Sequence, residues 1–253
     1  MKGRCNVLLN GVSLLSLDEN IVIRDISYQP PEIEHTVTAL AGRNGGIVTG
    51  SRKAESSVVI TFGLYAYSTQ ARQKALQTVI GWARNGGILE TSDRPDQYLD
   101  CVCTGLPALN SVVGWTDDLS VTFTAYAMPF WQALDCVRIA ATASNSPVNT
   151  FIPGNDKTLV DAVLTATGSV TEITVTAGET SITLSGLTLS SGDVITISHD
   201  SNYLIRIRKG NDSLLANRTS LSSDDLEVMC GQVNGFSVSS GVTAEFSVKG
   251  VWH

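Results

Sequence analysis

The chain has 253 residues, of which 43% are hydrophobic and 16% are charged, and its formal net charge is -7. This composition excludes a disordered chain and supplies enough apolar side chains for one large folded domain or two medium ones. The acidic balance argues against nonspecific nucleic-acid binding, which depends on clustered cations.

The N-terminal part predicts short strands joined by glycine-rich turns. Asn10-Gly11 lies between the apolar runs 7–9 and 12–15, a strong signal for a hairpin with a type I′ turn. Three more strands are expected, at residues 21–26, 33–40 and 56–64. The glycine-rich stretch 42–46 resembles a phosphate loop only in composition, because no strand-to-helix junction and no Lys-Ser/Thr pair follow it. We therefore expect a flexible connection there.

One segment predicts an amphipathic helix. The residues that recur at helical spacing are Ala71, Ala75, Leu76, Val79, Ile80 and Ala83. The side chains expected on the outer face are Arg72, Gln73, Lys74 and Gln77. Ser68 or Thr69 offers an N-cap hydroxyl, and Asn85-Gly86-Gly87 offers a left-handed stop.

Strands are expected again after this stop, at residues 88–91, 98–103 and 119–127. Pro95-Asp96 suits the middle of a type I turn. Cys101-x-Cys103 is half of a metal-site pattern, but no second Cys or His pair lies at ligand spacing, so packed thiols are expected. The chain has five cysteines, an odd number that excludes a complete set of intramolecular disulfides, and we expect a protein folded in a reducing compartment.

Four features in this order form a recognisable combination. They are a strand ending in TFGL, a helix ending in a Trp and a glycine stop, the segment SDRPDQYL, and FTAYAMPFW, which ends at Trp131. Together they resemble the N-terminal domain of siphophage distal tail proteins, the Dit family. The resemblance implies that residues 1–131 form a ring of six copies at the end of the tail tube, on which tail-tip and receptor-binding components are mounted.

The pattern changes after Trp131. One strand is expected at 136–141, followed by a polar connection, and many short strands separated by glycines follow from residue 161. This predicts an antiparallel β-sandwich. The ending DDLEVMCGQVNGFSVSSGVTAEFSVKGVW resembles the galectin-like second domain of the same family. The expected fold class is therefore mainly β: a sandwich-like domain at 1–131 with one α-helix and a β-hairpin, then a galectin-like antiparallel sandwich at 132–253.

Two groups of residues have side chains of the types found in catalytic sites. The carboxylates Asp93, Asp96 and Asp100 have the chemistry of a general acid and base. His199-Asp200 beside a serine has the residue types of a catalytic triad, but no G-x-S-x-G elbow accompanies it. We expect a subunit contact in the first case, with Asp93 accepting turn amides and Arg94 pairing with a carboxylate, and a turn in the second. No enzyme activity, metal or cofactor is expected.

The expected function is that of a structural virion protein at the tail tip, assembled in the host bacterial cytoplasm and making no membrane contact. The resemblance implies a homo-hexamer whose partners are the tail tube protein, a tail-associated lysin or tail-tip protein, and a receptor-binding protein. DNA would pass the lumen without specific binding, since a negative wall repels phosphates. The candidate ring-contact residues are Asp93, Arg94, Pro95, Asp96, Gln97 and Tyr98, with a second set of Gly42, Arg43, Asn44, Gly45 and Gly46 within the loop 42–49.

The alternative function is a carbohydrate-binding module for host-surface glycans, because aromatic side chains on loops can serve as sugar platforms. Its candidate residues are His199, Asn202, Arg206 and Trp252, which do not have the spacing of the glycan-binding set of galectins. A galectin-like shape alone does not confer sugar binding.

Overall fold

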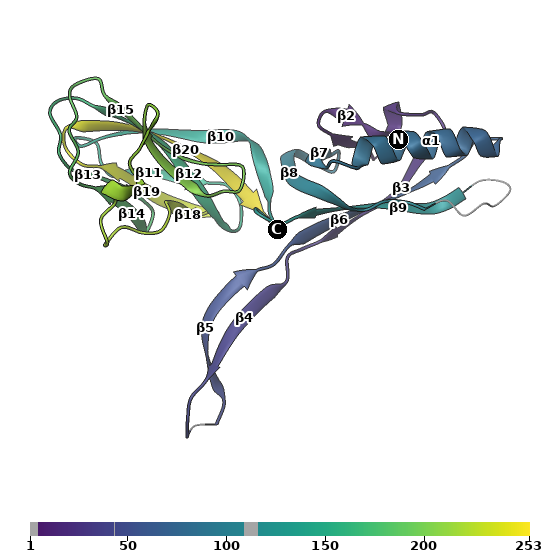
Figure 1. Ribbon diagram of the computed structural model, residues 1–253, viewed down its shortest axis with the longest axis horizontal. Coiled ribbons are helices and arrows are strands. Elements are labelled where there is room, and N and C mark those ends of the chain that lie inside the picture. The colour runs from purple at the N-terminus through teal and green to yellow at the C-terminus, as the bar shows by residue number, and fades with distance from the viewer. Residues whose placement is uncertain (1–4, 43, 109–115) are drawn as a thin grey trace. The chain divides into compact units, whose positions relative to one another are not determined.

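The computed structural model describes residues 5–42, 44–108 and 116–253, and antiparallel strands make up most of this part of the chain (Figure 1). The mainly β fold is confirmed. The chain divides into two compact units, Met1–Trp131 together with His253 (unit 1) and Gln132–Trp252 (unit 2). Among the described residues, every helix is too short or too polar to reach across a bilayer.

Unit 1 is a sheet covered by one α-helix. Its elements are β1 (Val7–Leu9), β2 (Val12–Ser13), β3 (Ile21–Gln29), β4 (Ile33–Ala39), β5 (Gly46–Lys53), β6 (Ser56–Leu64), α1 (Thr69–Ala83), β7 (Gly87–Thr91), β8 (Arg94–Gly105) and β9 (Thr116–Ala125), with a 3-10 turn at Leu14–Ser16. The strand order is β3-β6-β9-β8-β7-β1-β2, and β4 and β5 form a separate two-stranded ribbon. In Figure 1 this ribbon extends from the ends of β3 and β6.

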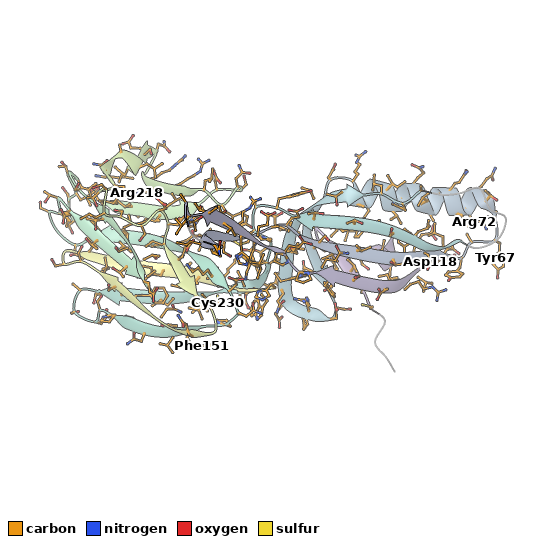
Figure 2. The ribbon with its side chains drawn as sticks, turned by 90° about the horizontal axis from the view of Figure 1, so that it is seen from below. Tyr67, Arg72, Asp118, Phe151, Arg218 and Cys230 are labelled. Atoms are coloured by element: carbon orange, nitrogen blue, oxygen red, sulfur yellow. The ribbon has the colours of Figure 1, made fainter. Side chains whose placement is uncertain are left out.

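The core of unit 1 lies between the sheet and α1. The alternation in β6 buries Val58, Ile60 and Phe62 on one face, as the pattern predicts. Trp82 of α1 packs edge-on against Phe123 of β9, with ring centroids 5.9 Å apart. The indole Nε1 of Trp82 also donates a hydrogen bond to a backbone carbonyl of β2. Figure 2 shows the helix running along the strands. The aromatic contact and this hydrogen bond hold the helix on the sheet.

The turn between β1 and β2 has the expected geometry. Asn10 and Gly11 both adopt positive φ, at 51° and 77°, as a type I′ turn requires. The Asn10 side chain also reaches the stop after α1. Its Nδ2 donates to the carbonyl of Gly86, and its Oδ1 accepts the backbone N–H of Ile88. One asparagine therefore closes its own turn and ties the helix end to β7.

Helix α1 starts and ends close to the expected positions, but one side chain contradicts the expected outer face. Ser68 is the N-cap residue, and its Oγ accepts a hydrogen bond from the N–H of Ala71 at 3.1 Å. Arg72, expected to face outward, is buried with 2% of its surface exposed. Its guanidinium donates to the carbonyl of Ala66 and to Thr69 Oγ1. One acceptor lies in the turn before the helix and the other is the first helical residue, and periodicity alone does not reveal either contact.

Replacing Ser68 with alanine is expected to lower the free energy of unfolding of unit 1 by about 1 kcal/mol, because the first helical turn loses its side-chain acceptor. Chemical denaturation followed by the fluorescence of Trp82 measures this loss. Thr78→Ala is the matched control, since Thr78 is exposed within the same helix and alanine raises helix propensity. Equal losses in the two variants would contradict the capping role.

Unit 2 is a β-sandwich. Its elements are β10 (Trp131–Thr142), β11 (Val148–Ile152), β12 (Lys157–Ala166), β13 (Ile173–Ala177), β14 (Thr180–Leu184), β15 (Val194–His199), β16 (Ile205–Lys209), β17 (Asp212–Ser213), β18 (Glu227–Met229), β19 (Gln232–Val238) and β20 (Val242–Trp252), with a 3-10 turn at Leu215–Asn217. One sheet has the order β17-β16-β15-β12-β20-β10, with β18 paired to β12, and the other has the order β11-β19-β13-β14. Phe236 and Phe246, one from each sheet, meet in the core with ring centroids 5.2 Å apart.

The expected strands of unit 2 are present with shifts in their ends, and two strands were missed, β11 and the two-residue β17. β11 occupies Val148–Ile152, within and just beyond a segment expected to be a polar connection. It is the edge strand of its sheet and pairs only with β19 among the described residues. Because its side chains alternate between half-buried and exposed positions, its strand signal in the sequence is weak.

Candidate assembly surface

The segment 92–98 forms the turn between β7 and β8 and the first part of β8. Thr91 pairs with Arg94 across the ladder, so Ser92 and Asp93 form the tight turn. The expected type I turn at Pro95-Asp96 is wrong. Asp96 has φ of 67°, in the left-handed region, and lies where the pairing register shifts within β8. Asp96 is exposed at this irregularity.

Tyr28 connects this turn to β3. Its hydroxyl lies 2.6 and 2.7 Å from the two carboxylate oxygens of Asp93 and 3.0 Å from Thr91 Oγ1. Burial and the hydrogen bond to Asp93 raise the pKa of Tyr28, so the phenol stays protonated and donates to the carboxylate. The expectation that Asp93 accepts turn amides is replaced by this side-chain contact.

Arg94 was expected to pair with a carboxylate. In the structure it stacks on two aromatic rings. Its guanidinium carbon lies 4.7 Å from the centroid of the Tyr28 ring and 5.1 Å from that of Trp131. The two rings meet edge to face, with centroids 5.7 Å apart. Cation–π contacts of this kind contribute roughly 0.5–2 kcal/mol each. Sequence reasoning missed Tyr28 and Trp131, whose only signal is an aromatic residue at a strand boundary.

The other candidates in this segment have different environments. Pro95 and Asp96 are exposed, and Gln97 and Tyr98 are half-buried. The Gln97 Oε1 atom is buried and has no hydrogen-bond partner among the described residues. Within the described part of the chain, no hydrogen bond joins Asp93, Asp96 and Asp100 to one another, and Asp93 accepts from Tyr28 instead. Burial raises the pKa of Asp100.

The β4–β5 ribbon carries the second set of candidates. Gly42, Asn44 and Gly45 lie in its turn, Gly46 begins β5, and Arg43 lies outside the described residues. The expected loop 42–49 is therefore partly strand. Every described residue from Ile33 to Arg52 is exposed. The exposed apolar side chains on it are Ile33, Val37, Leu40, Ile47 and Val48.

The two thiols of the Cys101-x-Cys103 pattern are packed separately. Cys101 Sγ donates to the carbonyl of Gly87, and Cys103 Sγ donates to that of Gly105. Burial raises the pKa of Cys101 to about 12, so this thiol is protonated at neutral pH. Among the described residues, no group of three or more metal-ligating side chains comes together.

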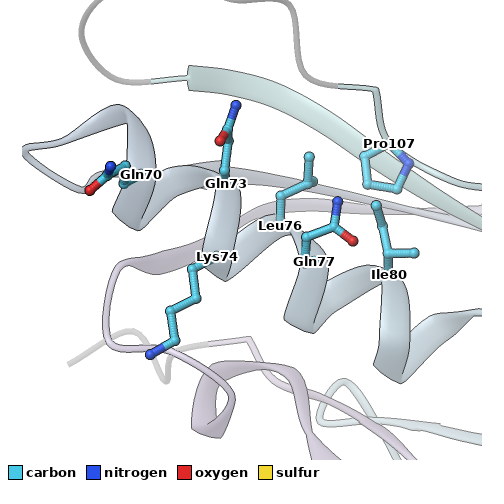
Figure 3. Close-up of a pocket in the computed structure, with 7 residues that line it drawn as sticks. All are labelled: Gln70, Gln73, Lys74, Leu76, Gln77, Ile80 and Pro107. Carbon is cyan, nitrogen blue, oxygen red and sulfur yellow. The ribbon is translucent and has the colours of Figure 1, made fainter.

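The outer side of α1 borders a shallow hollow of about 670 Å³ (Figure 3). The side chains that line it are Gln70, Gln73, Lys74, Leu76, Gln77, Ile80 and Pro107. In Figure 3, Pro107 lies beside Gln77 and Ile80. The lining offers amide hydrogen bonds and one ammonium group.

Three of the four carbohydrate candidates lie at the end of the β15–β16 pair, where carboxylates of the same chain engage them. His199 lies between two carboxylates, with Nδ1 2.8 Å from Asp161 Oδ1 and Nε2 2.7 Å from Asp225 Oδ1. Arg206 donates to Asp200, and the same carboxylate accepts the backbone N–H of Asn202. Trp252 is half-buried at the end of β20.

This fold is similar to that of a solved structure. No family model matches the chain, and no curated protein matches it in sequence. Among solved structures, the crystal structure of the Dit protein of phage SPP1 superposes with a TM-score of 0.72, over 97% of this chain and 98% of that one, at 11% identity. The chain has the fold of a phage distal tail protein. Two structures of the phage p2 baseplate in its activated conformation, with Sr and with Ca, cover 97% of each chain at 12% identity, but with TM-scores of only 0.43 and 0.42.

Proposed function

We propose that this protein is a structural component of a phage tail tip, with no enzymatic role of its own. The observation that carries this is the whole-chain match to SPP1 Dit, a protein described as a paradigm of the hub of the adsorption apparatus in phages that infect Gram-positive bacteria. Because the match extends over both units, it supports a protein of the same organisation, present in the virion at the end of the tail.

The proposed assembly is a homo-hexameric ring that joins the tail tube to the adhesion apparatus. The β4–β5 ribbon supports self-association. An isolated two-stranded ribbon is only marginally stable in water, and both of its outer edges present unpaired backbone groups. Val37 and Val48 pair across the ribbon and are 60% and 57% exposed. Burial against another subunit would remove this apolar surface from water.

The ring would mount its partners on the outside and leave a channel for DNA within. The proposed partners are the tail tube protein, a tail-associated lysin or tail-tip protein, and a receptor-binding protein. The net charge of -7 suits a channel through which DNA passes without binding, since like charges repel. In this proposal, unit 1 forms the ring and unit 2, as a galectin-like domain, carries the adhesion components.

Val37→Asp is expected to weaken self-association by about tenfold or more, because an unpaired carboxylate would enter an apolar contact. Light scattering across a concentration series, with negative-stain images of the particles, measures the change. Thr78→Asp is the matched control, since it adds the same charge at an exposed position on α1. The ring proposal fails if the unmodified chain stays monomeric throughout the series and on isolated tail tubes, or if both variants weaken association equally.

A further inference from the structure

Unit 1 contains a pocket of about 170 Å³ that the proposed ring does not explain. It lies where β3 ends and β6 begins, beside the β7–β8 turn. The lining side chains that matter here are Tyr28, Pro30, Ser56, Arg94, Trp131 and His253. Pockets for drug-sized ligands usually measure about 300–1,000 Å³, so this one suits a single small group.

The Arg94 guanidinium, in the wall of this pocket, has N–H donors that need a hydrogen-bond acceptor. The rings of Tyr28 and Trp131 stack against it, but a stacked ring accepts none of its in-plane N–H donors in a normal hydrogen bond. Within the described part of the chain, these donors make no hydrogen bond to a carboxylate or carbonyl oxygen. The aromatic pair therefore orients the guanidinium and leaves its in-plane N–H donors to a further acceptor.

Ser56 is a second unmet polar group in the same pocket. Its side-chain Oγ is buried, the residue is only 6% exposed, and the hydroxyl has no hydrogen-bond partner within the described chain. A buried hydroxyl left without a partner costs roughly 1–3 kcal/mol. The neighbouring Ser57 donates to Gln29 Oε1 at 2.7 Å, so an acceptor is available nearby for one serine and not for the other.

One basic side chain, Lys53, lies near the pocket. The Lys53 ammonium lies over the ring of Phe130, 5.3 Å from its centroid, and Phe130 is in ring contact with His253. The one carboxylate beside Arg94 in the chain, that of Asp93, has both oxygens within hydrogen-bond distance of the Tyr28 hydroxyl. The N–H donors of Arg94 and the hydroxyl of Ser56 therefore remain for an occupant of the pocket.

We infer that this pocket binds a carboxylate, and that its occupant is an Asp or Glu side chain of a second copy of this chain. The planar fork of an arginine binds a carboxylate through two parallel hydrogen bonds, and the Ser56 hydroxyl can donate a third. Acidic side chains outnumber basic ones here, 24 to 17, so a second copy has many to offer. The identity of the occupant rests on the proposed ring, whereas the carboxylate specificity rests on the pocket alone.

The pocket is tested first on the full chain with a small probe. N-acetyl-L-glutamate N-methylamide presents a glutamate side chain, and N-acetyl-L-glutamine N-methylamide has the same shape without the charge. At constant ionic strength, the charged probe is expected to shift the NMR signals of the Trp131 indole and the Arg94 Nε–H, and the neutral probe to shift neither. Equal responses to both probes, or no response at tens of millimolar, overturn the inference.

Variants assign the response to the two polar groups. Arg94→Ala is expected to weaken binding of the charged probe at least tenfold, and Arg94→Lys less, because the charge remains while the fork is lost. Ser56→Ala is expected to weaken it several-fold. Arg84→Ala, at an exposed position after α1, is the control and should bind as the unmodified chain does. If Arg94→Ala is unfolded by circular dichroism, Arg94→Lys and Ser56→Ala decide the result, and unchanged binding in both overturns the inference.

The occupant is tested separately by zero-length crosslinking. In the Arg94→Lys variant, a carbodiimide should join the new amine to the carboxylate that occupies the pocket. Mixing ¹⁵N-labelled with unlabelled chains shows by mass spectrometry whether the linked peptides come from two copies. A link between copies supports the inference. A link within one copy, or assembled particles without a link at position 94, overturns the second copy as occupant. A chain that binds the probe but never assembles overturns the proposed ring and this occupant, but not the carboxylate specificity.

Discussion

Replacing Gly86 with alanine is expected to destabilise unit 1 by about 3 kcal/mol or more, since a left-handed backbone and a steric overlap are combined at one position. Gly86 has a backbone φ of +64°, a conformation that residues other than glycine rarely adopt. A Cβ atom added there would lie 2.3 Å from the carbonyl oxygen of Cys101 and 2.6 Å from the Cα of Val102. Both are backbone atoms of β8, so a rotamer change cannot relieve the contact.

The position of Gly86 explains why the effect should spread beyond the turn. Its N–H donates to the carbonyl of Ala83, which ends α1, and its own carbonyl accepts from the Asn10 side chain. Displacing Gly86 would therefore disturb the helix end, the β1–β2 turn and β8 together. Hydrogen exchange followed by mass spectrometry should show faster exchange in peptides from all three elements.

Gly81→Ala is the matched control for this prediction. Gly81 lies inside α1, and no atom lies within 4 Å of the position of an added Cβ. Alanine there is expected to stabilise the helix by about 0.5–1 kcal/mol, because it reduces the backbone freedom of the unfolded chain and favours the helix. If the two substitutions change the free energy of unfolding by the same amount in the same direction, the close approach of β8 to Gly86 is not what makes glycine necessary.

Local sequence patterns predicted the elements whose structure is determined by residues close together in the chain. The Asn10-Gly11 turn, the Ser68 cap and the alternation of β6 all follow from neighbours within a few residues. β5 was not predicted, because its glycines and exposed residues have a weak strand signal and its order comes from pairing with β4. Arg72 was placed on the wrong face because its acceptors, in the preceding turn and at the first helical residue, are not visible in the periodicity.

The contacts of the segment 92–98 were harder to predict from local sequence patterns. The sequence placed Asp93 and Arg94 next to each other and suggested a cluster of carboxylates. The structure adds Tyr28 from β3, which is 65 residues from Asp93 in the sequence, and Trp131. Both rings lie outside the segment 92–98. Those rings change the chemistry of Arg94 from an expected intramolecular ion pair to a stacked cation with free donors. Such a contact arises from tertiary packing, and no spacing within the segment 92–98 encodes it.

His199 is expected to make unit 2 lose about 3 kcal/mol of stability as the pH rises from about 6.5 to about 9. Its side chain is only 7% exposed, and each ring nitrogen lies within hydrogen-bond distance of a different carboxylate, that of Asp161 or Asp225. Both nitrogens can donate only if the imidazole is protonated. Burial acts to lower the pKa, but the hydrogen bonds and charges of the two carboxylates together outweigh it and raise the pKa to about 9.

The sign of the effect follows from this direction. In the unfolded chain, a histidine loses its proton near pH 6.5, whereas in the folded chain His199 keeps it up to about pH 9. The stabilisation is therefore complete below about pH 6.5 and is lost as the pH rises through the folded value. Denaturation of the unmodified chain and of His199→Gln at a series of pH values measures the difference, in which the titration of other groups cancels. A difference that stays constant from pH 6 to 10 would contradict the prediction.

The two carboxylates can be tested directly through the titration of the His199 ring, followed by NMR. Asp225→Asn should lower its midpoint, because the ring loses a charged acceptor 2.7 Å from Nε2. Asp224→Asn is the matched control, since that carboxylate is adjacent in sequence but fully exposed, and its ion pair is with Arg218. If both variants leave the midpoint unchanged, direct contact with Asp225 does not hold the proton. If only Asp225→Asn lowers it, a histidine that resembled part of a catalytic triad in the sequence is instead a charged link between β12, β15 and the segment before β18.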